Sequence, residues 1–156
     1  MLKRLEFIKN MVESSNLDKI FYSCYYLDKE SQKKMKNWME FNKIPDPTPI
    51  EELHCTLIYS KIRPINYTPS TIPIVVDLSK VSFKHLGKLS PEVTVILLPK
   101  VPALTERYEL AKSKGAISDF PSYIPHITIS NKVFDFEDLT QPDFMITLDQ
   151  ETIRYS

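Results

Sequence analysis

The chain has 156 residues with 42% apolar and 26% charged side chains, which is typical of a folded domain rather than a disordered protein. We predict a single domain over residues 1–156, long enough to bury a hydrophobic core without disulfides or metals. Basic and acidic residues number 20 each, and the zero net charge argues against duplex nucleic acid or an acidic membrane as a partner. Two cysteines, Cys24 and Cys55, cannot form a disulfide framework, so we expect a cytoplasmic protein.

Common catalytic signatures are absent from the sequence. The two glycines, Gly87 and Gly115, lie far apart, whereas phosphate-binding loops and dinucleotide-binding folds need clustered glycines. No CxxC, HExxH or GxSxG motif occurs, and no apolar run approaches the roughly 20 residues of a membrane span. The sequence therefore argues against ATP-driven, NAD-dependent, zinc-finger and serine-hydrolase classes, and we expect no cofactor.

The first half of the chain predicts helices and strands in alternation. Apolar residues at helical spacing indicate helices, and an aromatic FYSCYYL segment is typical of a strand. The prolines of IPDPTP end the second helix, because closely spaced prolines cannot continue it. The predicted elements are a helix over 2–13, a strand over 21–27, a helix over 29–42, a strand over 53–60 and a proline-containing connection over 61–71.

The second half predicts a similar series. VTVILL is continuously apolar and predicts a central strand, and Gly115 suits the end of the helix that follows. The predicted elements are a strand over 74–82, the central strand over 93–98, a helix over 102–114, a strand over 126–130, and short closing strands over 144–148 and 152–155, within a C-terminal segment 143–155.

An internal duplication relates the two halves. Residues 72 positions apart, as from His54 to His126, match in their predicted elements and in the His-x-Thr that ends each unit. Two strand-helix-strand lobes, roughly 18–60 and 90–131, predict a pseudo-symmetric α+β domain rather than a solenoid, which needs at least three repeats.

The His-x-Thr motifs are the candidate catalytic groups. Side chains alternate faces along a strand, so His54 shares a face with Thr56, and His126 shares one with Thr128. Two imidazoles can supply one base and one acid near neutral pH, and threonine hydroxyls can donate to phosphoryl oxygens. The quartet therefore suits a phosphodiester that brings its own ribose 2′-hydroxyl as nucleophile, with no metal.

Other interpretations of these residues stay open at this point. A histidine on a strand is often structural, and two histidines can also belong to a metal site. Zinc normally takes three or four protein ligands, however, and no further His or Cys has matching spacing. We expect His85, which lacks the threonine, to be structural or peripheral, and Cys55 and Trp38 to lie in the core.

The motifs His54-Cys-Thr56-Leu and His126-Ile-Thr128-Ile resemble those of the 2H phosphoesterase superfamily. The stretches EELHCTLIYS, FKHLGKLSPEVTVILLPK and GAISDFPSYIPHITIS are similar to the phage anti-CBASS phosphodiesterases, over most of the chain. This resemblance implies a fold of two lobes with antiparallel sheets around a central cleft. It also implies action in the host bacterial cytoplasm.

The resemblance further implies cleavage of cyclic di- and trinucleotide messengers such as 3′,3′-cyclic GMP-AMP (3′,3′-cGAMP), without a metal, cofactor or protein partner. The implied catalytic residues are His54, Thr56, His126 and Thr128. One histidine deprotonates the 2′-hydroxyl that attacks phosphorus, and the other protonates the leaving 5′-oxygen. A 2′,3′-cyclic phosphate forms and is hydrolysed to a linear 3′-phosphorylated product.

Base-binding residues are predicted from the same resemblance, which places an aromatic residue early in the chain and polar or aromatic groups near its end. Our candidates are Tyr22, Tyr123 and Glu151, since stacking on a base contributes about 1–3 kcal/mol. The tail carries Tyr155 but lacks the expected tryptophan.

Two alternative functions remain. One is a 2H enzyme acting on RNA 2′,3′-cyclic phosphate ends, which the zero net charge disfavours for long RNA. The other is a sponge that binds cyclic nucleotides without cutting them, which would not need a paired acid and base.

Overall fold

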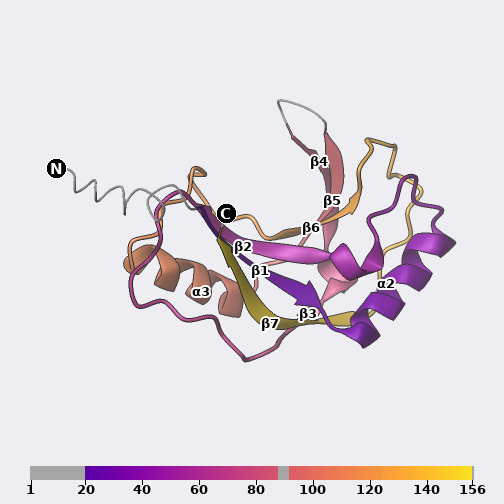
Figure 1. Cartoon of the computed structure of the whole chain (residues 1–156). Coiled ribbons are helices and arrows are strands. Elements are labelled where there is room, and N and C mark those ends of the chain that lie inside the picture. The colour runs from indigo at the N-terminus through magenta and orange to yellow at the C-terminus, as the bar shows by residue number, and fades with distance from the viewer. Residues whose placement is uncertain (1–19, 88–91, 156) are drawn as a thin grey trace.

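The computed structural model describes residues 20–87 and 92–155, which form an α+β fold with a seven-stranded sheet (Figure 1). The helix predicted over 2–13 lies outside these residues. In this part of the chain, no helix is long and apolar enough to span a bilayer. The elements are β1 (Phe21–Leu27), α2 (Lys29–Phe41), the 3₁₀ turn η2 (Ile50–Glu52), β2 (His54–Ser60), β3 (Ile74–Asp77), the 3₁₀ turn η3 (Leu78–Lys80), β4 (Ser82–Leu86), β5 (Val93–Leu97), α3 (Pro102–Ser113), β6 (His126–Ser130) and β7 (Met145–Tyr155).

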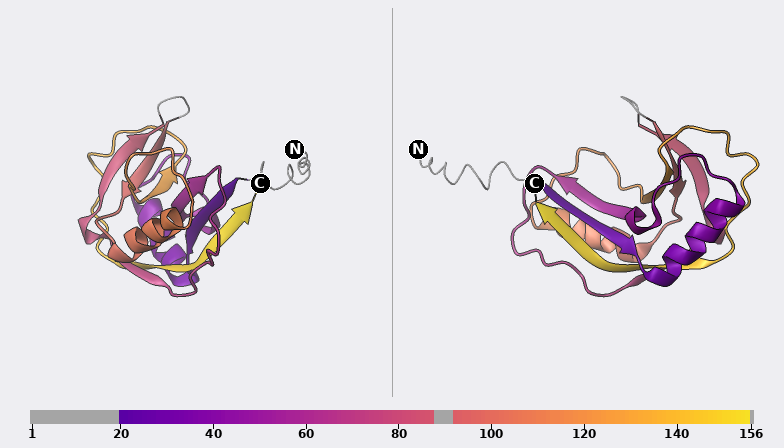
Figure 2. Two further views of the ribbon diagram at one scale, coloured as in Figure 1. Left: turned by 90° about the vertical axis from the view of Figure 1, so that its left-hand side faces the viewer. Right: turned by 45° about the vertical axis from the view of Figure 1, so that its right-hand side comes forward.

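The sheet has two halves that meet at its centre. Its strand order is β3-β7-β1-β2-β6-β5-β4, and every paired strand is antiparallel to its neighbour. β2 and β6 are joined by one residue pair, Cys55 with Ile127, and the sheet curls as it passes from one half to the other (Figures 1 and 2). The predicted pseudo-symmetric α+β fold is confirmed, with the two lobes joined into one curled sheet.

The duplication extends to fine detail. β1–α2–β2 and β5–α3–β6 are both strand-helix-strand units whose two strands pair antiparallel. In β2 the register jumps past Leu57, and in β6 it jumps past Ile129, which is the position 72 residues later. Each motif strand therefore carries a bulge immediately after its threonine. A bulge increases local twist and re-aims side chains, and bulges are common beside active sites.

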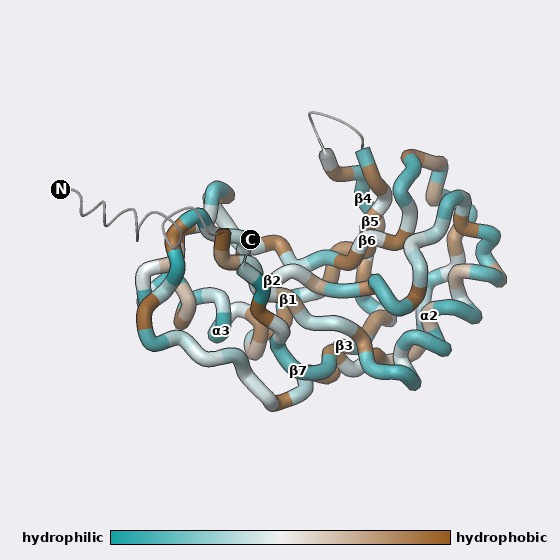
Figure 3. The backbone as a smooth tube through the Cα atoms, viewed as in Figure 1, coloured by the Kyte–Doolittle hydropathy of each residue, from teal (hydrophilic) through white to brown (hydrophobic). Residues whose placement is uncertain are grey.

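Capping and side-chain pattern in the sequence account for the two helices. The Asp28 carboxylate accepts a hydrogen bond from Ser31 N at 2.8 Å and caps the first turn. Met35, Trp38 and Met39 are buried on one stripe, while Figure 3 shows the helix as largely hydrophilic with hydrophobic positions interspersed. Helix α3 begins with Pro102, whose missing N–H costs nothing in a first turn.

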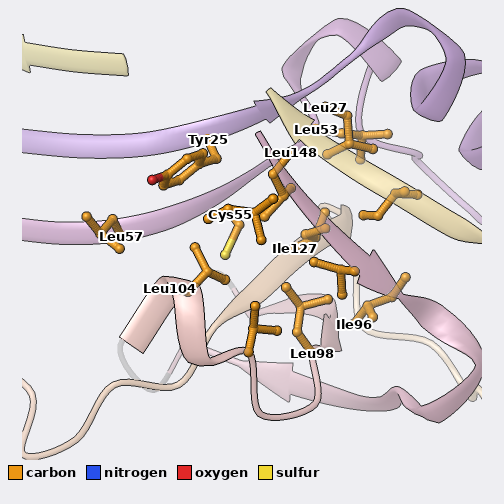
Figure 4. Packing of buried hydrophobic residues seen from close by; sticks show 14 of the residues in the cluster. Tyr25, Leu27, Leu53, Cys55, Leu57, Ile96, Leu98, Leu104, Ile127 and Leu148 are labelled. Atoms are coloured by element: carbon orange, nitrogen blue, oxygen red, sulfur yellow. The ribbon is translucent and has the colours of Figure 1, made fainter. Parts of the chain in front are cut away.

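One hydrophobic core connects both helices with the sheet. Figure 4 shows Leu104 of α3 beside Cys55 and Leu57 of β2, close to the ring of Tyr25. Residues of α2 belong to the same cluster. The core therefore covers one face of the sheet, which we call the core face. The opposite face, on which the motif histidines lie, we call the open face.

Two of the predicted strands are corrected. The strand predicted over 74–82 ends at Asp77, because the Asp77 carboxylate accepts a hydrogen bond from Ser79 N at 2.9 Å and caps η3. β4 then follows as a strand that the sequence did not predict. The strand over 93–98 is confirmed as β5 but lies one place from the sheet edge. Its apolar run reflects burial of both faces, since the neighbouring Val95 and Ile96 are both 0% exposed.

The two predicted closing strands are one continuous strand, β7. Its polar middle, Asp149 and Gln150, is exposed and suggested a break. The strand continues because the two pairings overlap: Met145–Leu148 pair with β3, and β1 pairs with Leu148 before the polar middle and with Glu151–Tyr155 after it.

Candidate active site

The two motifs lie on the same face of adjacent strands. Cys55 and Ile127 are fully buried on the core face, whereas the His and Thr positions on either side of them are half-buried on the open face. This is the alternation that period two predicts. Because Cys55 pairs with Ile127 in antiparallel strands, His54 lies toward Thr128, and Thr56 lies toward His126. The predicted quartet His54, Thr56, His126 and Thr128 is thus brought together across the centre of the sheet.

The loops that precede the two motif strands brace each other's strands. The loop before β2 bridges to the end of β6 through Pro47 and Ser130, and the loop before β6 bridges to the end of β2 through Ser118 and Ser60. The Ser60 hydroxyl accepts from Ile117 N at 2.9 Å, and the Ser130 hydroxyl donates to a loop carbonyl in the other half. These reciprocal bridges fix the loops that lead into β2 and β6, and thereby the start of each strand, where its histidine lies.

Both histidine rings are held in the same way. His54 Nδ1 lies 2.7 Å from the carbonyl oxygen of Glu52, and His126 Nδ1 lies 2.8 Å from that of Ile124. A carbonyl only accepts, so each Nδ1 carries the proton and donates it. In a neutral ring, Nε2 is then the nitrogen with a free lone pair. Each half therefore presents Nε2 as the atom that can take up or deliver a proton.

Tyr22, predicted to bind substrate, lies within the quartet. Its hydroxyl is 2.8 Å from Thr56 Oγ1, and its ring centroid is 6.4 Å from that of His54. Burial raises the pKa of Tyr22 to about 12. The phenol therefore keeps its proton at neutral pH and is available as a hydrogen-bond donor.

The sequence did not single out three further residues beside His54. The ring of Tyr26 lies 5.5 Å from the His54 ring, and Arg154 donates a hydrogen bond to the Tyr26 hydroxyl. Tyr59 contacts Tyr22 edge-on at 6.3 Å. Strict alternation from Thr56 would turn Tyr59 to the core face, and only the bulge at position 57 returns it to the open face. No sequence signal marks that bulge.

Tyr123, a predicted base-binding residue, does not lie on the open face. Its hydroxyl donates to the backbone oxygen of Thr56 at 3.0 Å and lies 3.8 Å from Cys55 Sγ. Its ring stacks on Tyr108 of α3 at 4.6 Å. The structure therefore does not bring Tyr123 to the quartet, because its ring packs on the core face.

Glu151, the third predicted base-binding residue, also lies away from the quartet in this structure. It pairs with Tyr25, so its side chain points to the core face, where it is 0% exposed. Arg107 forms an ion pair with it at 2.8 Å, and Ser70 N donates to the same carboxylate at 2.9 Å. The hydroxyls of Ser23 and Tyr67 occupy its other oxygen. The carboxylate is thus held by four polar partners on the face of the sheet opposite the quartet.

His85 and Cys55 both lie away from the quartet. His85 Nε2 lies 2.9 Å from the Phe134 carbonyl oxygen, and its ring packs against Phe136 at 4.9 Å. Cys55 is 0% exposed, and burial raises the pKa of its thiol to about 12. Within residues 20–87 and 92–155, no cluster of three or more His, Cys, Asp or Glu side chains is placed to hold a metal ion.

Comparison with protein families shows which family the chain belongs to. The family model described as anti-CBASS protein Acb1 matches residues 19–154, which is nearly the whole chain. The chain belongs to the Acb1 family. A relative from Acinetobacter phage Ac42, named anti-CBASS protein Acb1, is 32% identical over 74% of this chain and 75% of its own length. An Acb1 from Enterobacteria phage T4 is 30% identical over 70% of each chain.

Solved structures show that the Acb1 fold of this chain is shared more widely. E. coli LigT complexed with NADP+ superposes with a TM-score of 0.57 at 18% identity, covering 88% of each chain. A crystal structure described as a phosphoesterase superposes with a TM-score of 0.57 at 15% identity, covering 89% of this chain and 88% of its own. At these identities the likeness concerns the fold. It confirms the fold that the resemblance implied.

Proposed function

We propose that this chain is a phosphodiesterase that cleaves cyclic di- and trinucleotide messengers such as 3′,3′-cGAMP, and thereby counteracts CBASS immunity in an infected bacterium. The observation that carries the proposal is the pair of His-x-Thr motifs on one open face, each with its histidine Nδ1 held by a backbone carbonyl. Membership of a family named for anti-CBASS activity supports the choice of substrate class.

The quartet can perform the reaction with its own groups. The neutral imidazole of one histidine takes the proton of a ribose 2′-hydroxyl through Nε2, and the oxygen attacks the adjacent phosphorus. The protonated imidazole of the other histidine gives a proton to the leaving 5′-oxygen. Thr56 and Thr128 donate hydrogen bonds to the non-bridging oxygens as negative charge develops there. The resulting 2′,3′-cyclic phosphate opens when water attacks, with the two histidines in exchanged roles.

Charge and aromatic groups on the open face suit a compact anionic ligand. Arg154 lies with its guanidinium 5.5 Å from the centroid of the Tyr26 ring and supplies a cation near His54. A cyclic dinucleotide has a second phosphodiester that is not cut, and Arg154 is our candidate for binding it. Tyr26 and Tyr22 offer flat surfaces for a base.

The test is incubation of the purified protein with 3′,3′-cGAMP in excess EDTA, followed by mass spectrometry of the nucleotides. We expect a linear dinucleotide with a 3′-phosphate or 2′,3′-cyclic phosphate. Intact messenger released on denaturation, at a fixed ratio to protein, would instead indicate a sponge. Cleavage confined to RNA 2′,3′-cyclic phosphate ends in a parallel reaction would indicate the other 2H activity.

A further inference from the structure

The threonines of the two motifs differ in their hydrogen bonds, although the motifs match in the carbonyl that holds each histidine Nδ1 and in the bulge after each threonine. Thr56 Oγ1 lies 2.8 Å from the Tyr22 hydroxyl. By strand pairing, Thr94 opposite Ser130 matches Ser23 opposite Ile58, so the position that matches Tyr22 in the other half is Val93, which has no hydroxyl. Within residues 20–87 and 92–155, no side chain hydrogen-bonds to the hydroxyl of Thr128. The Tyr22–Thr56 contact thus breaks the pseudo-symmetry of the site.

The chemistry of two hydroxyls in contact fixes the direction of this hydrogen bond once substrate is present. A threonine hydroxyl has one proton and two lone pairs. When Thr56 donates its proton to a phosphoryl oxygen, which only accepts, it must accept from Tyr22. The Tyr22 phenol is half-buried and protonated at neutral pH, so it can make that donation.

We propose that Tyr22 is a positioning residue that orients the Thr56 hydroxyl toward the scissile phosphate, an inference that rests on the proposed phosphodiesterase function. The arrangement is a chain of donors, from the Tyr22 O–H to the Thr56 O–H to the phosphoryl oxygen. Hydrogen bonds in such chains polarise and strengthen one another. The Thr56 donor is thereby stronger and better oriented than the Thr128 donor, so the two halves contribute unequally to stabilising the transition state.

The substitution Tyr22→Phe separates this role from base stacking. Phenylalanine keeps the ring that contacts His54 and Tyr59, and loses only the hydroxyl. We expect kcat on 3′,3′-cGAMP to fall about tenfold, as for loss of one oriented hydrogen bond in a partly desolvated site, with KM within about twofold of the wild type. If Tyr22 only stacked on a base, Tyr22→Phe would leave both kcat and KM unchanged.

A double-mutant cycle shows whether the effect passes through Thr56. In a Thr56→Val background, Tyr22→Phe should cost no more than about twofold, since the hydroxyl that it orients is gone. In a Thr128→Val background, the same change should again cost about tenfold. Tyr155→Phe, which removes a phenol hydroxyl from the core face, is the matched control and should leave kcat unchanged.

The outcomes are distinct. An unchanged kcat in Tyr22→Phe, or an equal loss in the Thr56→Val and Thr128→Val backgrounds, would overturn the positioning role while leaving the phosphodiesterase intact. Absence of turnover by the wild type would overturn the proposed function, and this inference with it. Thermal melting of each variant identifies any loss that is due to unfolding.

Discussion

The two halves of the sheet present the same motif in different surroundings. His54 lies 5.5 Å from the ring of Tyr26, which also accepts a hydrogen bond from Arg154. His126, by contrast, pairs across its strand with the aliphatic Leu97. The repeated features, namely the strand, the carbonyl on Nδ1 and the bulge, suit proton transfer. The unrepeated aromatic and cationic groups suit recognition of an anionic nucleotide, which is the division of roles that the proposed function predicts.

Removing a motif histidine should have the largest effect on activity. We expect His54→Ala to lower kcat on 3′,3′-cGAMP at least about 10²-fold, as for loss of a general acid or base, with folding retained. His85→Ala removes the histidine that contacts a carbonyl away from the open face, and serves as the matched control. Retained turnover in His54→Ala, or an equal loss in His85→Ala, would contradict the assignment.

Glu151→Ala tests whether the core face affects stability without affecting substrate binding. Glu151→Ala leaves Arg107 without its carboxylate, and breaking such a buried pair should lower the free energy of unfolding by about 3 kcal/mol. Urea unfolding measures this change. At a temperature where the variant is folded, its KM should match the wild type, because the carboxylate points to the core face. A KM raised about tenfold, as we expect for Arg154→Gln below, would show that Glu151 binds substrate.

Arg154 tests the divergence of the two halves. Arg154→Gln removes a cation from the open face and should raise KM for 3′,3′-cGAMP about tenfold with little change in kcat, the size of a lost charge-assisted hydrogen bond. Arg63→Gln is the control, because Arg63 lies over the ring of Tyr155, whose strand partner Phe21 is in the core. Equal KM values for the two variants would show that Arg154 does not contact the ligand.

The dependence of kcat on pH distinguishes the histidines, which transfer protons, from Tyr22, which does not. Two histidines in opposite protonation states predict a bell-shaped kcat around neutrality, and a flat profile from about pH 5 to 9 would contradict the scheme. Burial raises the pKa of Tyr22 to about 12, so its phenol stays protonated across this range. Tyr22→Phe should therefore lower the whole profile without moving either limb.

Tyr123→Phe should have the smallest effect. The phenol of Tyr123 donates to the Thr56 backbone oxygen from the core face, and its loss should cost about 1 kcal/mol of stability with kcat unchanged. Chemical denaturation and steady-state kinetics measure the two quantities. A large loss of kcat would place Tyr123 in the site after all.

The sequence predicted the quartet because strand alternation acts over two residues and needs no knowledge of neighbours. His54 and Thr56 face the same way in any strand. By contrast, the face of Tyr59 depends on a bulge, and the face of Glu151 depends on register with β1. Tyr123 precedes its strand and turns toward Tyr108 of α3, a contact between segments that the sequence does not relate. Alternation therefore predicts the direction of side chains within the motif strands, whereas elsewhere the direction depends on pairing between elements that the sequence does not show.

The central claim is that both motifs form one catalytic unit, and the most direct test is the rate of 3′,3′-cGAMP cleavage by His54→Ala, His126→Ala and the double variant. Groups that act as a unit are strongly non-additive. We predict that each single variant loses at least about 10²-fold and that the double variant loses little more. Losses that multiply in the double variant, or one single variant with full activity, would show that the two halves do not act together.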